Sequence, residues 1–129
     1  MSDRESRVGR CYELAFWKFM DGEHPDAVLV HGYPRYRRPG EDQNRKFGHA
    51  WLEYDSPRGP VCWDPTNDME IGKLVYYMLG HIENAECVRY ETVRSVCEVV
   101  LKHEHFGPWT PIPEGTIFCL LYTSDAADE

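Results

Sequence analysis

Three residues of this chain have the chemical types that thiol-based catalysis requires. Cys11 offers a nucleophile, His49 a base and Asp64 an acid that orients the base. A carboxylate bonded to one imidazole nitrogen selects the tautomer and leaves the other nitrogen available for a proton. A thiol beside such a histidine ionises well below its usual pKa. These types predict a catalytic triad if the fold brings the three side chains together.

His49 and Asp64 lie in two segments whose pattern predicts an antiparallel hairpin. Residues 47–54 alternate as a half-buried strand does, residues 55–60 are rich in turn formers, and residues 61–64 form the return strand. A two-residue turn at Ser56-Pro57 would set His49 directly opposite Asp64, and a six-residue turn that pairs Tyr54 with Val61 would set it diagonally. Because side chains alternate with period two, both registers put the two residues on one face. We therefore expect a contact between them with either turn.

Cys11 lies in the first turn of a segment, residues 8–20, whose pattern predicts a helix ended by Asp21 and Gly22. The positive end of the helix dipole lowers the pKa of a thiol placed there. The backbone N–H groups of the same turn can bind a developing oxyanion. The apolar residues that would form its buried stripe are Cys11, Tyr12, Ala15, Phe16 and Phe19.

Each member of the trio also has a purely structural interpretation. Cysteine is among the most buried residue types, so Cys11 taken alone is better explained as a core residue. A histidine on a strand is often a satisfied core residue. Asp64 with Pro65 can simply end a strand. The order and placement of the three residues, together with the hairpin geometry, favour the catalytic interpretation.

The remaining pattern predicts an α+β domain in which the N-terminal helix packs on a small antiparallel sheet. We expect strands at 27–31, 86–90 and 115–122, an irregular segment at 32–46, a helical piece from the capping residues 66–68 through about residue 77, and an amphipathic helix after the N-cap Thr92. Residues 1–122 would form this single domain. Residues 123–129 are expected to be a disordered tail, and the run from Leu120 resembles translated adapter sequence, which would make it a sequencing artefact.

Composition limits the class of function. The chain has 129 residues, of which 42% are hydrophobic, so one globular domain is expected. With 14 basic and 22 acidic residues the net charge is −8, which argues against nucleic acid as a partner. The basic run 35–38 is interpreted as a solvated loop. The apolar run 117–122 is too short to cross a membrane, and five cysteines without a Cys-x-x-Cys pair predict a reducing, cytoplasmic location.

Five segments together resemble a known superfamily. They are Cys-Tyr-Glu-Leu-Ala at 11–15, Leu-Val-His-Gly at 29–32, Gly-His-Ala-Trp-Leu-Glu at 48–53, Trp-Asp-Pro-Thr-Asn at 63–67 and His-Phe-Gly-Pro-Trp at 105–109. Together they look like small uncharacterised bacterial and phage proteins of the papain-like, transglutaminase-like cysteine peptidase superfamily. The resemblance covers about residues 8–109.

This resemblance implies a papain-like core with Cys11 as nucleophile, His49 as base and Asp64 as orienting acid. It implies a hydrolase or acyltransferase acting on an amide, isopeptide or thioester bond of a peptide or small amide, with no metal or organic cofactor. Papain-type enzymes carry a glutamine before the nucleophile, and residues 1–10 contain none. The second oxyanion donor would then come from another part of the chain, for which Gln43 or Asn44 is one option, or the activity would be weak.

Two other classes of function stay open. The missing glutamine makes a catalytically silent binding module of the same fold a credible alternative. His103 and His105 suggest a small metal-binding protein, in which Cys87 or Cys97 would join the two histidines. Because a His-x-His pair at a helix end points its rings in different directions, favourable placement near the helix C-terminus is the simpler account.

Overall fold

The computed structural model describes residues 10–35 and 45–118, and it shows a mixed α+β domain. Three α-helices accompany a five-stranded antiparallel sheet in this part of the chain. In chain order the elements are α2 (Cys11–Met20), β1 (Val28–Gly32), β2 (Phe47–Ser56), β3 (Gly59–Asp64), β4 (Met69–Gly72), α3 (Lys73–Gly80), the 3₁₀ turn η1 (Asn84–Glu86), β5 (Val88–Tyr90), α4 (Val93–His103) and the short β6 (Ile117–Phe118).

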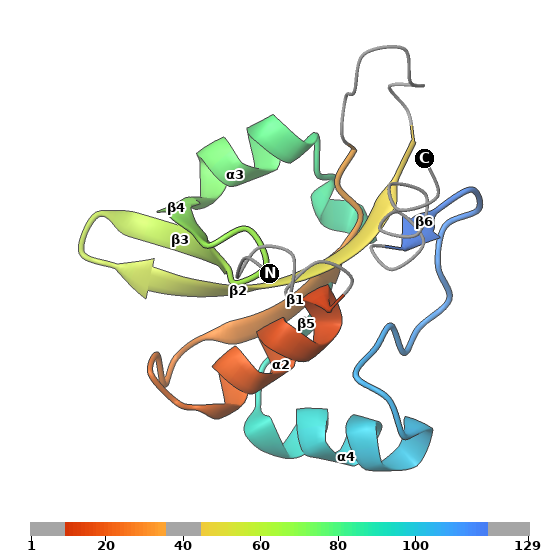
Figure 1. Ribbon diagram of the computed structural model, residues 1–129. Coiled ribbons are helices and arrows are strands. Elements are labelled where there is room, and N and C mark those ends of the chain that lie inside the picture. The colour runs from red at the N-terminus through yellow and green to blue at the C-terminus, as the bar shows by residue number, and fades with distance from the viewer. Residues whose placement is uncertain (1–9, 36–44, 119–129) are drawn as a thin grey trace, which may run out of the picture.

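The sheet has the strand order β4-β3-β2-β1-β5, and β6 adds to the start of β2 in parallel. Figure 1 shows α3 on one side of the sheet and both α2 and α4 on the other. The prediction of an N-terminal helix packed on a small antiparallel sheet is therefore confirmed.

Strands β2 and β3 form the predicted hairpin. Tyr54 pairs with Val61, and the ladder continues to Ser56 and Gly59, which leaves a two-residue turn. This register is the one that sets His49 diagonally across from Asp64. The period of two then places both side chains on the same face of the sheet, as expected.

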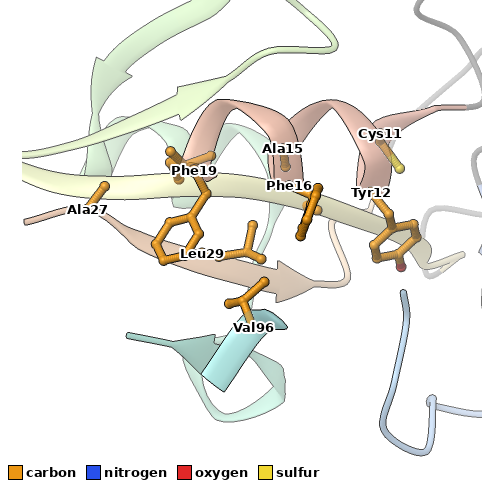
Figure 2. Close-up of a cluster of buried hydrophobic side chains, with 10 residues drawn as sticks. Cys11, Tyr12, Ala15, Phe16, Phe19, Ala27, Leu29 and Val96 are labelled. Carbon is orange, nitrogen blue, oxygen red and sulfur yellow. The ribbon is translucent and has the colours of Figure 1, made fainter. Parts of the chain in front are cut away.

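The two faces of the sheet carry separate hydrophobic clusters. On one face Leu29 and Leu52 pack with Phe16 of α2 and Val96 of α4, and Figure 2 shows several side chains of this cluster. On the other face Trp51 packs with Val30, Cys62 and Tyr76 of α3. Adjacent strand residues such as Leu29 and Val30 point to opposite faces, so each strand contributes to both clusters.

The predicted helical piece is wrong in its first half. Residues 69–72 form strand β4, and the helix α3 begins at Lys73. The backbone N–H of Asn67 donates to the Asp64 carboxylate at 3.2 Å, and Asp68 has a φ of 51°. These two features reverse the chain after β3, so that β4 pairs back along it instead of starting a helix.

The amphipathic helix after Thr92 is confirmed as α4, and the Thr92 hydroxyl caps it by accepting the Ser95 N–H at 3.1 Å. Arg35, expected in a solvated loop, instead packs against the end of α3 and donates to the His81 carbonyl at 2.8 Å.

Within the described ranges no helix has the length and apolar character needed to span a membrane. The predictions for residues 8–9, 36–44, 119–122 and the tail 123–129 lie outside the described residues.

Candidate active site

The structure brings His49 and Asp64 into direct contact. The Nε2 atom of His49 lies 2.8 Å from the Oδ2 atom of Asp64, and both side chains are buried. His49 stands near the start of β2 and Asp64 ends β3, so the hairpin register is what joins them. The predicted contact between these two residues is confirmed.

Asp64 is held by two further residues. The Tyr76 hydroxyl of α3 donates to Oδ2 at 2.6 Å, and the Asn67 side-chain amide donates to the same atom at 2.8 Å. Burial alone would raise the pKa of Asp64, but the charge and hydrogen bond of His49 and the bonds from Tyr76 and Asn67 outweigh burial. The pKa of Asp64 is lowered to about 2, so this residue is a carboxylate at neutral pH.

The charge on Asp64 determines the tautomer of His49. A carboxylate accepts hydrogen bonds and donates none, so the hydrogen in this contact belongs to Nε2 of His49. In the neutral imidazole the Nδ1 atom then carries the free lone pair. Nδ1 is therefore the atom of His49 that can take a proton from a nucleophile.

Cys11 lies on the other side of the sheet. It is the first residue of α2 and has 0% exposure, and it belongs to the cluster that packs under Ala50 and Leu52. Figure 2 shows it at one end of this cluster, in the first turn of the helix. Its Sγ atom lies 3.8 Å from the carbonyl oxygen of Gly48, the residue before His49. The structure thus sets Cys11 beside the backbone that leads into His49, while the His49 side chain points toward α3.

Cys11 is also disulfide-bonded in the structure, whereas Cys62, Cys87 and Cys97 are free. The cysteine pattern of the sequence predicts reduced thiols, and the bond at Cys11 departs from that prediction. The first turn of α2 receives no capping hydrogen bond from the side chain of Arg10. Gln43 and Asn44, suggested as oxyanion donors, lie outside the described residues.

Sequence reasoning missed Tyr76 and Asn67 as members of the site. Asn67 was expected only as a capping residue, and Tyr76 only as part of the predicted helical piece. The signal that was available for Asn67 is its spacing, because an asparagine three residues after an aspartate at a strand end is well placed for an Asx-type turn. Tyr76 gave no such signal, since only the docking of α3 on the sheet brings its hydroxyl to Asp64.

A buried carboxylate supports the same face of the sheet. Glu53 accepts hydrogen bonds from the Trp51 indole at 3.0 Å and from the Tyr77 hydroxyl, and it pairs with Lys73 at 3.2 Å. Trp51 in turn packs its ring 6.1 Å from the ring of His49. The hydrogen bond from Trp51 to Glu53 therefore fixes the position of the indole ring that packs beside His49, the candidate base.

A second buried histidine lies on the α2 face. His31 contacts the rings of Tyr12, Tyr90 and Trp109, with centroids 4.8 to 5.2 Å apart. Burial, helped by the nearby His49, lowers the pKa of His31 to about 3, so it is neutral at pH 7. Its Nε2 atom has no hydrogen-bond partner among the described residues.

The histidine pair at the end of α4 does not gather further metal ligands. The rings of His103 and His105 lie 5.9 Å apart, and Nδ1 of His105 accepts the Gly107 N–H at 3.1 Å. In the described parts of the chain no group of three or more His, Cys, Asp or Glu side chains is arranged to hold a metal ion.

Comparison with known proteins does not identify a relative. No protein-family model, no curated protein and no solved structure matches the chain.

Proposed function

We propose that this protein is a cysteine-dependent hydrolase or acyltransferase that acts on an amide, isopeptide or thioester bond. The observation that carries the proposal is the buried His49–Asp64 pair, with Asp64 held as a carboxylate and Nδ1 of His49 left to take a proton. A carboxylate is costly to bury unless it is hydrogen-bonded, and carboxylates with a strongly shifted pKa are enriched at catalytic sites.

The proposed reaction uses Cys11 as the nucleophile. Nδ1 of His49 accepts the thiol proton, and the thiolate attacks the carbonyl carbon of the substrate. The tetrahedral intermediate collapses to a thioester when the amine or thiol leaves with the proton carried by His49. Water or a second amine then attacks the thioester and releases Cys11 as the thiol. Asp64 stabilises the imidazolium at each of these steps.

This assignment makes two demands on Cys11. Its disulfide must first be reduced by a thiol reductant, and its sulfur must then reach Nδ1 of His49. The resemblance of the segments around residues 11, 49 and 64 supports Cys11 as the nucleophile, as does its place at the start of a ten-residue helix.

The second candidate function is a catalytically silent binding module. It is favoured by the burial of Cys11, by its disulfide and by its place on the face opposite the His49–Asp64 contact. In this case the polar cluster around Asp64 serves to anchor β2, β3 and α3 to one another.

The test is the pH dependence of thiol alkylation, measured cysteine by cysteine. The protein is reduced with dithiothreitol, desalted and treated with iodoacetamide between pH 5.5 and 9. Trypsin cleavage after Arg10 and Lys18 isolates Cys11 from Cys97, which serves as the internal reference in the same sample. The enzyme proposal predicts that Cys11 reacts at least about tenfold faster than Cys97 at pH 6.

His49→Ala is expected to abolish this low-pH reactivity, because the imidazole no longer stabilises the thiolate. His24→Ala, which changes a histidine in the turn between α2 and β1, is the matched control and should leave the profile unchanged. If Cys11 follows the same pH profile as Cys97, or keeps its profile in His49→Ala, the binding module replaces the enzyme.

A further inference from the structure

We propose that a pocket beside Asp64 binds one uncharged apolar side chain of a peptide, of about the size of leucine or phenylalanine. The pocket lies between α3, the end of β3 and the residues that follow β1. This binding site goes beyond the proposed catalysis, because it requires neither a reduced nor a reactive Cys11.

The pocket has the volume of a single large side chain. It encloses about 240 Å³. An engineered apolar cavity of about 150 Å³ is enough to hold a benzene molecule, so a phenyl or isobutyl group fits with room to spare. The lining residues are Pro34, Asp64, Asn67, Met69, Tyr76, Leu79, Gly80 and Ile82.

The walls of the pocket are apolar and closely packed. Pro34, Met69, Leu79 and Ile82 contribute aliphatic side chains, and the flexible thioether of Met69 can adapt to groups of different shape. Behind them the backbone of Gly80 approaches so closely that a Cβ atom there would lie 3.2 Å from the Pro34 side chain. An apolar ligand group would therefore meet protein atoms on several sides of the pocket.

The polar end of the pocket does not favour a charged ligand. The carboxylate of Asp64 is almost fully buried and its Oδ2 atom already accepts hydrogen bonds from His49, Asn67 and Tyr76, so a cationic group could approach it only by losing its own water in an otherwise apolar pocket. An anionic group would lie beside a carboxylate whose pKa is about 2 and would be repelled. The ligand group that fits these surroundings is uncharged.

The surface outside the pocket points to a peptide rather than an isolated small molecule. Leu79 lines the pocket and is 66% exposed, and Met78 next to it is equally exposed. Leu74 and Val75, one turn earlier in α3, are more than half exposed. Residues four apart on a helix are neighbours, so the four form one apolar strip that leads to the pocket. A strip of this kind offers contacts to residues that flank the buried side chain.

The test follows the methionine methyl groups by NMR in protein labelled with ¹³C-methyl methionine, kept oxidised so that the result does not depend on thiol chemistry. The probes are N-acetyl-leucine amide and N-acetyl-phenylalanine amide, with the corresponding glutamate and lysine amides as charged comparisons. We expect a saturable shift of the Met69 methyl with the two apolar probes, and binding at least about fivefold weaker with the charged ones. The methyl of Met20, on α2, is the internal control and should not shift.

Leu79→Asp should weaken binding of the apolar probes at least about fivefold, whereas Leu74→Asp should change it less than about twofold. Both side chains are mostly exposed, so both variants should keep the unfolding transition of the parent protein. Equal effects of the two variants, or a Met69 methyl that does not respond to the apolar probes, would overturn the pocket assignment.

A separate experiment tests whether the ligand is a peptide that also contacts the apolar strip. N-acetyl-Leu-Leu-Leu-amide should bind at least about threefold tighter than the single residue, and Met78→Asp should remove this gain. Equal affinity for the long and short probes would show that the pocket takes small molecules and that the strip is not used. Neither result affects the alkylation test, so the two proposals fail separately.

Discussion

The Oδ2 atom of Asp64 accepts hydrogen bonds from side chains of three different segments. His49 comes from β2, Asn67 from the turn after β3, and Tyr76 from α3. An ionised carboxylate can accept several donors at once, and each charge-assisted bond lowers its pKa. Asp64 is therefore positioned more firmly than by a contact with His49 alone. The ionised, fixed carboxylate in turn keeps the hydrogen of His49 on Nε2.

We expect Tyr76→Phe to lower the free energy of unfolding by about 2 kcal/mol at pH 7, because it removes a hydrogen bond to a buried charge. The pKa of Asp64 should rise from about 2 toward its ordinary value, since one of the bonds that lower it is gone. Urea unfolding measures the first effect and carboxyl ¹³C titration the second. Tyr54→Phe is the control, because Tyr54 lies near the end of β2 that is remote from His49. An unchanged titration of Asp64 in Tyr76→Phe would contradict this role for Tyr76.

The position of helix α4 can be predicted from its own sequence to a greater extent than that of helix α3. Helix α4 has a capping threonine and one buried valine, Val96, in a clear amphipathic pattern. Helix α3 has no capping side chain at Gly72 and exposes several large apolar residues. Its position rests on Tyr76, which packs on Trp51 and bonds to Asp64. It also rests on Tyr77 and Lys73, which contact Glu53. The helix that completes the candidate site is thus held by tertiary contacts rather than by its own pattern.

Thr92→Ala should lower the free energy of unfolding by about 1 kcal/mol, because it removes the cap on the Ser95 N–H. Thr92→Ser keeps a hydroxyl at this position and should cost far less. Urea unfolding compares the three proteins. Since α4 lies on the face opposite α3, both variants should bind the apolar probes like the parent. A loss in Thr92→Ser as large as that in Thr92→Ala would argue against the cap.

The molecule as a whole buries an ionisable group on each side of one sheet. Asp64 lies on the α3 face and is held as a carboxylate, whereas His31 lies on the α2 face and is held neutral among aromatic rings. Both arrangements become unfavourable in acid, but in different ranges of pH. The pKa of each group is lowered on folding, so in each case the unfolded chain takes up the proton first.

For His31 this linkage predicts the onset of acid unfolding. Its folded pKa of about 3 lies below the ordinary 6.5, so stability is complete above pH 6.5 and is lost progressively as the pH falls toward 3. The expected loss between pH 6.5 and 4.5 is roughly 2 kcal/mol. Asp64 contributes only below its ordinary pKa of 3.8, and Glu53, whose pKa is lowered from 4.5, contributes only near the lower end of the window, so most of the loss reports on His31.

His31→Phe should flatten the dependence of unfolding free energy on pH between 6.5 and 4.5, whatever its effect on stability at pH 7. Urea unfolding at four pH values, followed by tryptophan fluorescence, measures the slope. His103→Gln changes an exposed histidine at the end of α4 and should keep the slope of the parent. A slope that persists in His31→Phe would assign the acid sensitivity to another group.

Local pattern was enough to predict several features of this protein. The alternation of residues 47–54 and the turn after them placed His49 and Asp64 on one face of a hairpin, and the structure joins them at 2.8 Å. Thr92 and the apolar spacing after it predicted α4. Both succeed because strand alternation and helix capping depend on residues close in the chain. The same kind of reasoning failed for residues 69–72, where the Asp64 side chain turns the chain into β4.

The sequence by itself therefore determined the His49–Asp64 pair, because strand alternation puts the two residues on one face in either hairpin register. It did not determine the position of Cys11, because nothing within the hairpin specifies on which face α2 packs. That choice is made by long-range burial of the α2 stripe against Leu29, Leu52 and Val96. Tertiary structure also decided that Tyr76 reaches Asp64 and that a pocket forms beside it, since both depend on how α3 docks against the sheet.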